Sequence, residues 1–181
     1  MQEFLPRVYC YVNEFNLSDL SKLRKNINII YRNYNKIDHL NNLLKLKSFC
    51  KKANIKLYLS NNIKLSIKLG LNGVYIPSFN KKLNYCGFYN LPENFKIIGS
   101  AHNLKQIKIK ECQNVEIIFL SSLFKKNENY LGMNKFKLVS NLTKKKIVAL
   151  GGISKKNLKK LNLLNNPGFA GISFFEQKKG P

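Results

Sequence analysis

The sequence predicts a compact (β/α)₈ barrel of the TIM type, built by residues 1–181 as a single domain. Strand-like apolar runs alternate with helix-like amphipathic segments along the whole chain, which is the pattern of parallel βαβ units. Eight strand signals favour a closed barrel over an open sheet. The chain has 181 residues, enough for a full core but few for a barrel of this type. We therefore expect a weak fourth helix and a truncated last helix.

In the first half of the chain, strands are expected at residues 7–12, 27–31, 55–59 and 74–76. Helices are expected between them, over residues 18–25, 37–53 and 62–69. Ser18 is a suitable N-cap for the first of these helices. Asn61 or Asn62 is a suitable N-cap for the third helix, and Gly70 would close it.

In the second half, strands are expected at residues 96–98, 115–120, 147–150 and 169–174. Helices are expected over residues 103–112 and 133–141, with a last one starting at Lys155 behind a Ser154 N-cap. The segment 77–94 has no helical period and contains Pro77, Gly87 and Pro92. It is expected to be a long loop or a degraded helix, which is why the fourth helix is called weak.

A pair of glycines follows the apolar run that predicts the seventh strand. Gly151 and Gly152 carry no side chain, so the backbone can turn sharply there or approach a ligand closely. A strand end, two glycines and a helix start together favour phosphate binding by backbone N–H groups. The alternative is a tight turn that binds nothing, because glycine is also a common turn residue.

The composition limits the classes of partner. The formal net charge is +23, with 32 Lys and Arg against 9 Asp and Glu. The positive residues are mostly lysine and form no basic-aromatic motif, so we do not expect nucleic acid to be bound, whereas an anionic substrate would benefit from the charge. No apolar run approaches a membrane span, the N-terminus lacks a signal-peptide pattern, and the four cysteines form no metal-binding cluster. The expected compartment is the cytoplasm, with no membrane partner.

Four stretches of the chain together resemble the thiamine phosphate synthase/TenI family. Arg32 in Ile-Tyr-Arg-Asn-Tyr is similar to the family's Gln-x-Arg-x-Lys. Residues 57–76 resemble its Asn-Asp-Arg strand end, helix and Gly-Ala-Asp-Gly-Val-His-Leu strand. Residues 97–102 resemble its Gly-x-Ser-x-His, and residues 147–157 its Val-Ala-Ile-Gly-Gly-Ile-x-x-x-Asn. Because the order and separation agree, the resemblance covers most of the chain.

The resemblance implies a TIM barrel of thiamine biosynthesis. Synthases of this family join a pyrimidine diphosphate to a thiazole phosphate and release pyrophosphate, with Mg²⁺ on the leaving group, whereas TenI relatives aromatise a thiazole phosphate isomer. The ligand would be a phosphorylated thiazole or pyrimidine. The residues that the resemblance assigns to catalysis are Arg32, Ser100 and His102. Lys126 is a further candidate, in a stretch where the family's threonine donors are missing and lysines stand instead. The residues that the resemblance assigns to the ligand's phosphate are Gly151, Gly152 and Ser122.

Several positions depart from the family pattern. The metal-binding aspartates of the family fall at Asn61 and Asn80, and amide oxygens without charge should hold Mg²⁺ weakly. The chain is therefore either a synthase-type enzyme with a degenerate metal site or a relative that only binds a phosphorylated ligand or a partner. Alternative roles stay open for three of these residues. Arg32 could form a surface ion pair, and Ser100 and His102 could cap a helix.

Overall fold

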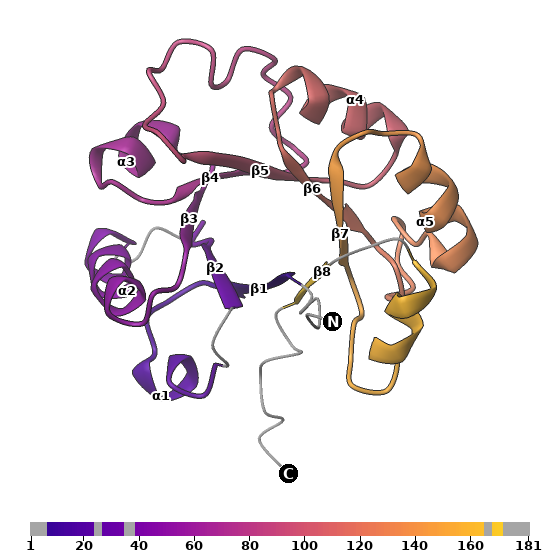
Figure 1. The fold of residues 1–181 in the computed structure, drawn as a ribbon, viewed down its shortest axis with the longest axis horizontal. Helices are drawn as coiled ribbons and strands as arrows, with labels where there is room; N and C mark the ends of the chain where they lie inside the picture. Colours follow the sequence, from indigo (N-terminus) through magenta and orange to yellow (C-terminus); the bar gives the residue numbers. More distant parts are fainter. Residues whose placement is uncertain (1–6, 24–26, 35–38, 165–167, 172–181) are drawn as a thin grey trace, which may run out of the picture.

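The computed structural model of the chain is a closed barrel of eight parallel strands with helices around it (Figure 1). It describes residues 7–23, 27–34, 39–164 and 168–171. The strands follow one another around the barrel in sequence order, and the last strand pairs with the first, with Arg7 opposite Gly168. This confirms the predicted TIM-type fold.

The strands are β1 (Arg7–Val12), β2 (Ile27–Tyr31), β3 (Leu57–Ser60), β4 (Gly73–Ile76), β5 (Lys96–Ala101), β6 (Ile117–Ser121), β7 (Lys146–Leu150) and β8 (Gly168–Gly171). The helices are α1 (Leu17–Leu20), α2 (His39–Lys52), α3 (Ile63–Lys68), α4 (Leu104–Cys112), α5 (Gly132–Asn141) and the 3₁₀ helix η1 (Leu158–Leu163). Each predicted strand overlaps an observed strand. Residues 172–174 of the predicted last strand, and any helix after it, lie outside the described residues.

Two helix starts differ from the sequence-based prediction. The side chain of Asn16, and not that of Ser18, caps α1, by accepting a hydrogen bond from the Asp19 N–H at 3.3 Å. After β7, no helix begins at Lys155, and the only helix described there is η1. Ser154 is not the N-cap of η1, because that position belongs to Asn157, whose side chain instead accepts from the Ser154 N–H at 2.9 Å.

The connection between β4 and β5 contains no helix. Residues 77–95 form turns and extended chain that cross the outside of the barrel, between α3 and α4 in Figure 1. Of the two predicted alternatives for the fourth helix, a long loop or a degraded helix, the structure shows the loop. Phe79 and Phe88 in this segment are exposed, as expected where no helix packs on the sheet.

The barrel interior is unusually aromatic. One cluster of buried residues points inward from the strands, and its largest members are Tyr9, Tyr11, Tyr58, Tyr75 and Phe119. The ring of Phe119 lies edge-on to Tyr9, Tyr11 and Tyr75, with centroids 4.8–6.3 Å apart. The space between the sheet and the helices is filled mostly by aliphatic residues, with a few aromatic ones such as Tyr31 and Phe136. Aromatic rings thus form the floor beneath the carboxyl ends of the strands.

None of the helices in the described part of the chain combines the length and apolarity needed to cross a bilayer.

Candidate functional site

Polar side chains line the carboxyl ends of the strands, directly above the aromatic floor. Side chains two residues apart on a strand face the same side of a sheet. Ile30, Tyr58, Ile98 and Phe119 belong to the interior cluster. The residues two positions later therefore face the barrel mouth, and they are Arg32, Ser60, Ser100 and Ser121. Active sites of TIM barrels lie at this end of the strands.

Arg32 is held at the mouth by aromatic rings. Its guanidinium carbon lies 5.1 Å from the ring centre of Tyr11 and 5.9 Å from that of Tyr34. The Tyr34 hydroxyl is 3.2 Å from the Ser60 Oγ, which fixes the second ring. Among the described residues, no carboxylate lies within ion-pair distance of Arg32. The arrangement leaves the positive charge of Arg32 available to an anionic ligand. It does not support the alternative that Arg32 forms an ion pair at the surface.

Ser100 belongs to a buried hydroxyl network below Arg32. The Tyr11 hydroxyl donates to the Tyr75 hydroxyl at 3.2 Å, and Ser100 also hydrogen-bonds the Tyr75 side chain. Burial raises the pKa of Tyr11 well above its ordinary value, and it raises the pKa of Tyr75 too. Both phenols therefore stay neutral at physiological pH. Ser100 itself is buried, so a ligand would reach it only at the base of the mouth.

His102 lies between two serines from neighbouring strand ends. Its Nε2 is 3.1 Å from the Ser78 Oγ, and its Nδ1 is 2.9 Å from the Ser121 Oγ. The N-cap of α4 is Asn103, whose side chain accepts from the Gln106 N–H at 3.0 Å. Neither Ser100 nor His102 is therefore the side-chain N-cap of α4, although the His102 N–H donates to the Gln106 Oε1 in its first turn at 2.8 Å. Both ring nitrogens are engaged in these bonds, so the imidazole is held in place at the strand ends and would meet a ligand only if one serine gave up its bond.

The turn at Gly151 and Gly152 has the positive φ values, 99° and 74°, that favour glycine. A Cβ at Gly151 would meet the Ser122 Oγ at 2.5 Å, and one at Gly152 would lie 2.4 Å from the Lys125 backbone nitrogen. The two glycines therefore let the chain after β6 pack against the turn. No described residue accepts a hydrogen bond from the N–H groups of Gly152 and Ile153, which leaves both as potential phosphate donors.

The two predicted site residues after β6 lie in different environments. Ser122 is buried, and its hydroxyl donates to the Lys125 carbonyl at 2.8 Å. This hydroxyl closes a turn and is not presented to the mouth, contrary to its predicted role. Lys126 is exposed and follows directly after the backbone that contacts Gly152. It therefore remains a candidate for an anionic ligand at the glycine turn.

Asn61 and Asn80, the positions where the family pattern has metal ligands, contact each other directly. The Asn80 Nδ2 donates to the Asn61 Oδ1 at 2.7 Å. In any amide–amide hydrogen bond one partner presents nitrogen, so both oxygens cannot face one cation from this arrangement. No group of three His, Cys, Asp or Glu side chains that could hold a metal occurs among the residues the structure describes. The residues present do not fit Mg²⁺, which prefers several oxygen ligands that include carboxylates.

The sequence analysis missed Lys110 and Gln113, which support the Asn80 turn from below. Lys110 is fully buried on α4, and its Nζ donates to Pro77 O and Asn80 O at 2.9 Å and to the Gln113 Oε1 at 2.8 Å. The Gln113 Nε2 donates to Asn80 O and Lys82 O at 3.1 and 2.9 Å. Burial lowers the pKa of Lys110 from 10.5 to about 8. The sequence held one signal of this burial, because Lys110 lies three residues after the apolar Ile107 and therefore on the same face of the helix.

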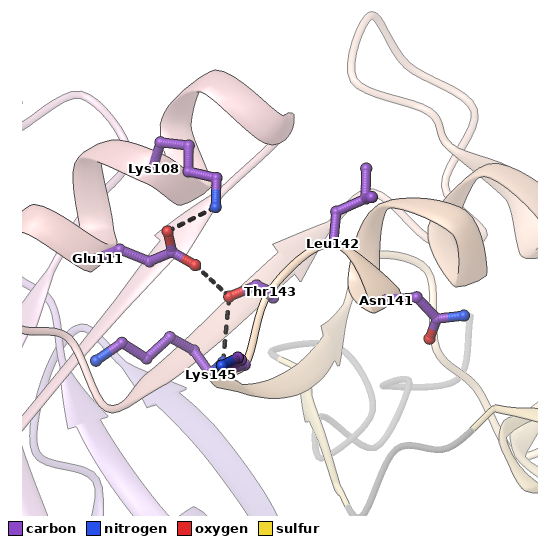
Figure 2. Close-up of a pocket in the computed structure, with 7 residues that line it drawn as sticks. Lys108, Glu111, Asn141, Leu142, Thr143 and Lys145 are labelled. Atoms are coloured by element: carbon purple, nitrogen blue, oxygen red, sulfur yellow. Dashed lines mark hydrogen bonds and ion pairs between the residues drawn. The ribbon is translucent and has the colours of Figure 1, made fainter.

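A separate surface pocket of about 500 Å³ lies between α4 and the chain that enters β7 (Figure 2). Glu111 accepts there from Lys108 at 2.9 Å and from the Thr143 hydroxyl, and the Thr143 oxygen accepts from the Lys145 N–H at 3.1 Å (Figure 2). Lys108 and Glu111 lie on the C-terminal part of α4, and Thr143 precedes the start of β7. The pocket is thus at the amino end of the strands, away from the mouth, and is not the candidate site.

Comparisons with known proteins match the chain to the thiamine phosphate synthases. The family described as thiamine monophosphate synthase matches residues 22–175. A thiamine-phosphate synthase of Hydrogenobaculum sp. is 28% identical over 135 residues, and one of Methanococcus vannielii is 34% identical over 82 residues. These matches cover 72% and 42% of this chain, but only 63% and 40% of the relatives' own lengths.

Solved structures carry the same fold. A thiamine phosphate pyrophosphorylase from Pyrococcus furiosus aligns with a TM-score of 0.75 at 16% identity, over 94% of this chain and 86% of that one. A thiamine phosphate pyrophosphorylase from Bacteroides thetaiotaomicron aligns with a TM-score of 0.57 at 12% identity, over 93% of this chain and 83% of that one.

Proposed function

This chain belongs to the thiamine monophosphate synthase family, and from that membership we propose that it joins a pyrimidine diphosphate to a thiazole phosphate and releases pyrophosphate. The observation that carries the proposal is the family match over residues 22–175, which includes the strand ends with Arg32, Ser100 and His102. Thiamine-phosphate synthase is also the name of the relatives from Hydrogenobaculum and Methanococcus.

The proposed roles follow from charge and position. Arg32 would neutralise the diphosphate of the pyrimidine, because its guanidinium stands at the mouth without a described carboxylate partner. Ser100 would donate to an oxygen of the same group as the bond to carbon breaks and pyrophosphate leaves with the bonding electrons. His102, which is hydrogen-bonded to Ser78 and Ser121, would donate there only after it releases one of these serines. The N–H groups of Gly152 and Ile153, with Lys126 nearby, would hold the phosphate of the thiazole.

A second candidate is a family member that binds a phosphorylated ligand without turnover. The observation that favours it is the direct hydrogen bond between Asn61 and Asn80, since this pair does not fit the Mg²⁺ that the family places on its leaving group. Both candidates share the ligand class and differ only in the reaction.

The two candidates are separated by one assay. The purified chain is mixed with the pyrimidine diphosphate and the thiazole phosphate, with Mg²⁺ or with EDTA, and thiamine phosphate and pyrophosphate are measured. Formation of both products, lost in Arg32→Ala, supports the synthase. Binding of either substrate by calorimetry, with no product in either buffer, supports the binding protein. Absence of both binding and product would refute the proposal.

A further inference from the structure

A chain of hydrogen bonds fixes the orientation of the two amide side chains at the corner formed by β3 and β4. The Lys82 N–H can only donate, so the Asn80 atom that it meets at 3.1 Å is the oxygen Oδ1. The other Asn80 atom, Nδ2, then faces Asn61, and the Asn61 atom that accepts at 2.7 Å is Oδ1. The Asn61 Nδ2 remains, and no described residue accepts a hydrogen bond from it.

The turn that carries Asn80 is held rigidly from below. Lys110 binds the carbonyls of Pro77 and Asn80, and Gln113 binds those of Asn80 and Lys82. These bonds fix the backbone on both sides of the Asn80 side chain. The buried Lys110 Nζ donates to the carbonyl of Asn80 itself, and a positive charge there also opposes the binding of a cation to the amide pair.

The same corner adjoins Arg32. The ring of Tyr34 lies 5.9 Å from the guanidinium of Arg32, and its hydroxyl is 3.2 Å from Ser60, the residue before Asn61. The Tyr34 ring also contacts Phe79, the residue before Asn80, with centroids 5.9 Å apart. The amide pair and the guanidinium therefore belong to one polar corner of the mouth.

An amide nitrogen with no acceptor in the protein can donate a hydrogen bond to a ligand, whereas a carboxylate at the same place would attract a cation. We infer that the Asn61 side-chain amide donates directly to an anionic phosphoryl oxygen of the ligand, so that this corner binds the oxygen without a divalent cation. The inference rests on the proposed function for the phosphorylated ligand. It goes beyond that function in giving Asn61 a role opposite to that of a metal ligand.

Calorimetry with inorganic pyrophosphate tests the role of Asn61. The unmodified chain should bind with affinities that agree within about threefold in EDTA and in Mg²⁺, a difference of less than 1 kcal/mol. Asn61→Asp removes the donor and adds a negative charge, so binding in EDTA should weaken by about tenfold or more. Asn62→Asp is the matched control, because it makes the same change one residue later, where the side chain caps α3 by accepting from the Leu65 N–H.

A second experiment tests whether Lys110 holds the Asn80 turn, first by a measurement that needs no ligand. Lys110→Met should raise the hydrogen-exchange rate of the Lys82 amide by about tenfold or more, as the turn loosens. It should also weaken pyrophosphate binding in EDTA. Lys108→Met, on the exposed face of the same helix, removes the same charge and should change neither quantity.

Several results would overturn the inference. One is binding of pyrophosphate only when Mg²⁺ is present, and another is no binding in either buffer. A third is equal affinity of Asn61→Asp and Asn62→Asp in EDTA. Metal-free binding that depends on Asn61, with no product formed, supports the inference and rejects the synthase. Product formation that needs Mg²⁺ and ignores Asn61→Asp supports the synthase and rejects the inference.

Discussion

Replacement of Gly152 by alanine should destabilise the chain through contact with its own loop. The φ of 74° costs an L-residue about 1–2 kcal/mol. The new Cβ would lie 2.4 Å from the Lys125 nitrogen and 2.9 Å from the Phe124 carbonyl carbon, both backbone atoms. Forcing them apart adds roughly 1–3 kcal/mol, the range for overpacked sites. The free energy of unfolding should therefore fall by about 2–5 kcal/mol.

Gly70→Ala is a control with the same kind of backbone strain and no contact. Gly70 has a φ of 58°, and a Cβ there would have no neighbour within 4 Å. Only the cost of about 1–2 kcal/mol for the positive φ applies. Thermal unfolding should show Tm lowered by roughly 4–20 °C in Gly152→Ala and by roughly 2–8 °C in Gly70→Ala, at about 2–4 °C per kcal/mol for this length.

One outcome of comparing the two variants would contradict this account of the turn. If Gly152→Ala lowers Tm no more than Gly70→Ala does, the chain after β6 does not rest on this glycine. Our account of the turn would then be wrong. Phosphate binding should be compared only in variants that remain folded, because a displaced loop would also move Lys126 and mimic the loss of a phosphate contact.

Three further outcomes are expected. Arg32→Ala should weaken pyrophosphate binding about tenfold or more, measured by calorimetry, and unchanged affinity would return Arg32 to a structural role. Asn61→Asp combined with Asn80→Asp should tighten Mg²⁺ binding by supplying carboxylates; tight Mg²⁺ binding in the unmodified chain would contradict this reading. The Lys110 pKa is lowered to about 8, so between pH 8 and 10.5 the unfolded chain holds more protons and stability should rise with pH. Relative to Lys110→Met, the unmodified chain should gain stability in urea unfolding across that window, and a constant difference would refute the lowered pKa.

The strands could be predicted from sequence because the signal is local. A parallel strand covered on both faces is an apolar run, and the run from Ile147 to Leu150 coincides with β7 to within one residue. The family motifs likewise placed Arg32 and His102 at strand ends. In both cases neighbouring residues carry enough information without knowledge of the rest of the fold.

The contacts that organise the site could not be predicted in this way. Lys110 meets Pro77 across 33 residues of sequence, and among many surface lysines its burial is visible only once α4 is placed on the barrel. After β7 the helix begins only at Leu158, so Ser154 stands three residues before the N-cap position at Asn157. The amide pair at Asn61 and Asn80 also depends on the turn geometry that Lys110 and Gln113 impose. These features arise from long-range hydrogen bonds, which local propensity does not encode.

The pairing of β1 with β8 has a consequence for how the chain is made. Arg7 lies opposite Gly168, so the first strand has no permanent second neighbour until nearly the whole chain has been synthesised. At about 5–20 residues per second, translation of this length takes on the order of 10–40 s. During that time the unpaired edge of β1, with its tyrosines, is open to other strands. The β1 edge is therefore covered last, when β8 takes its place beside it.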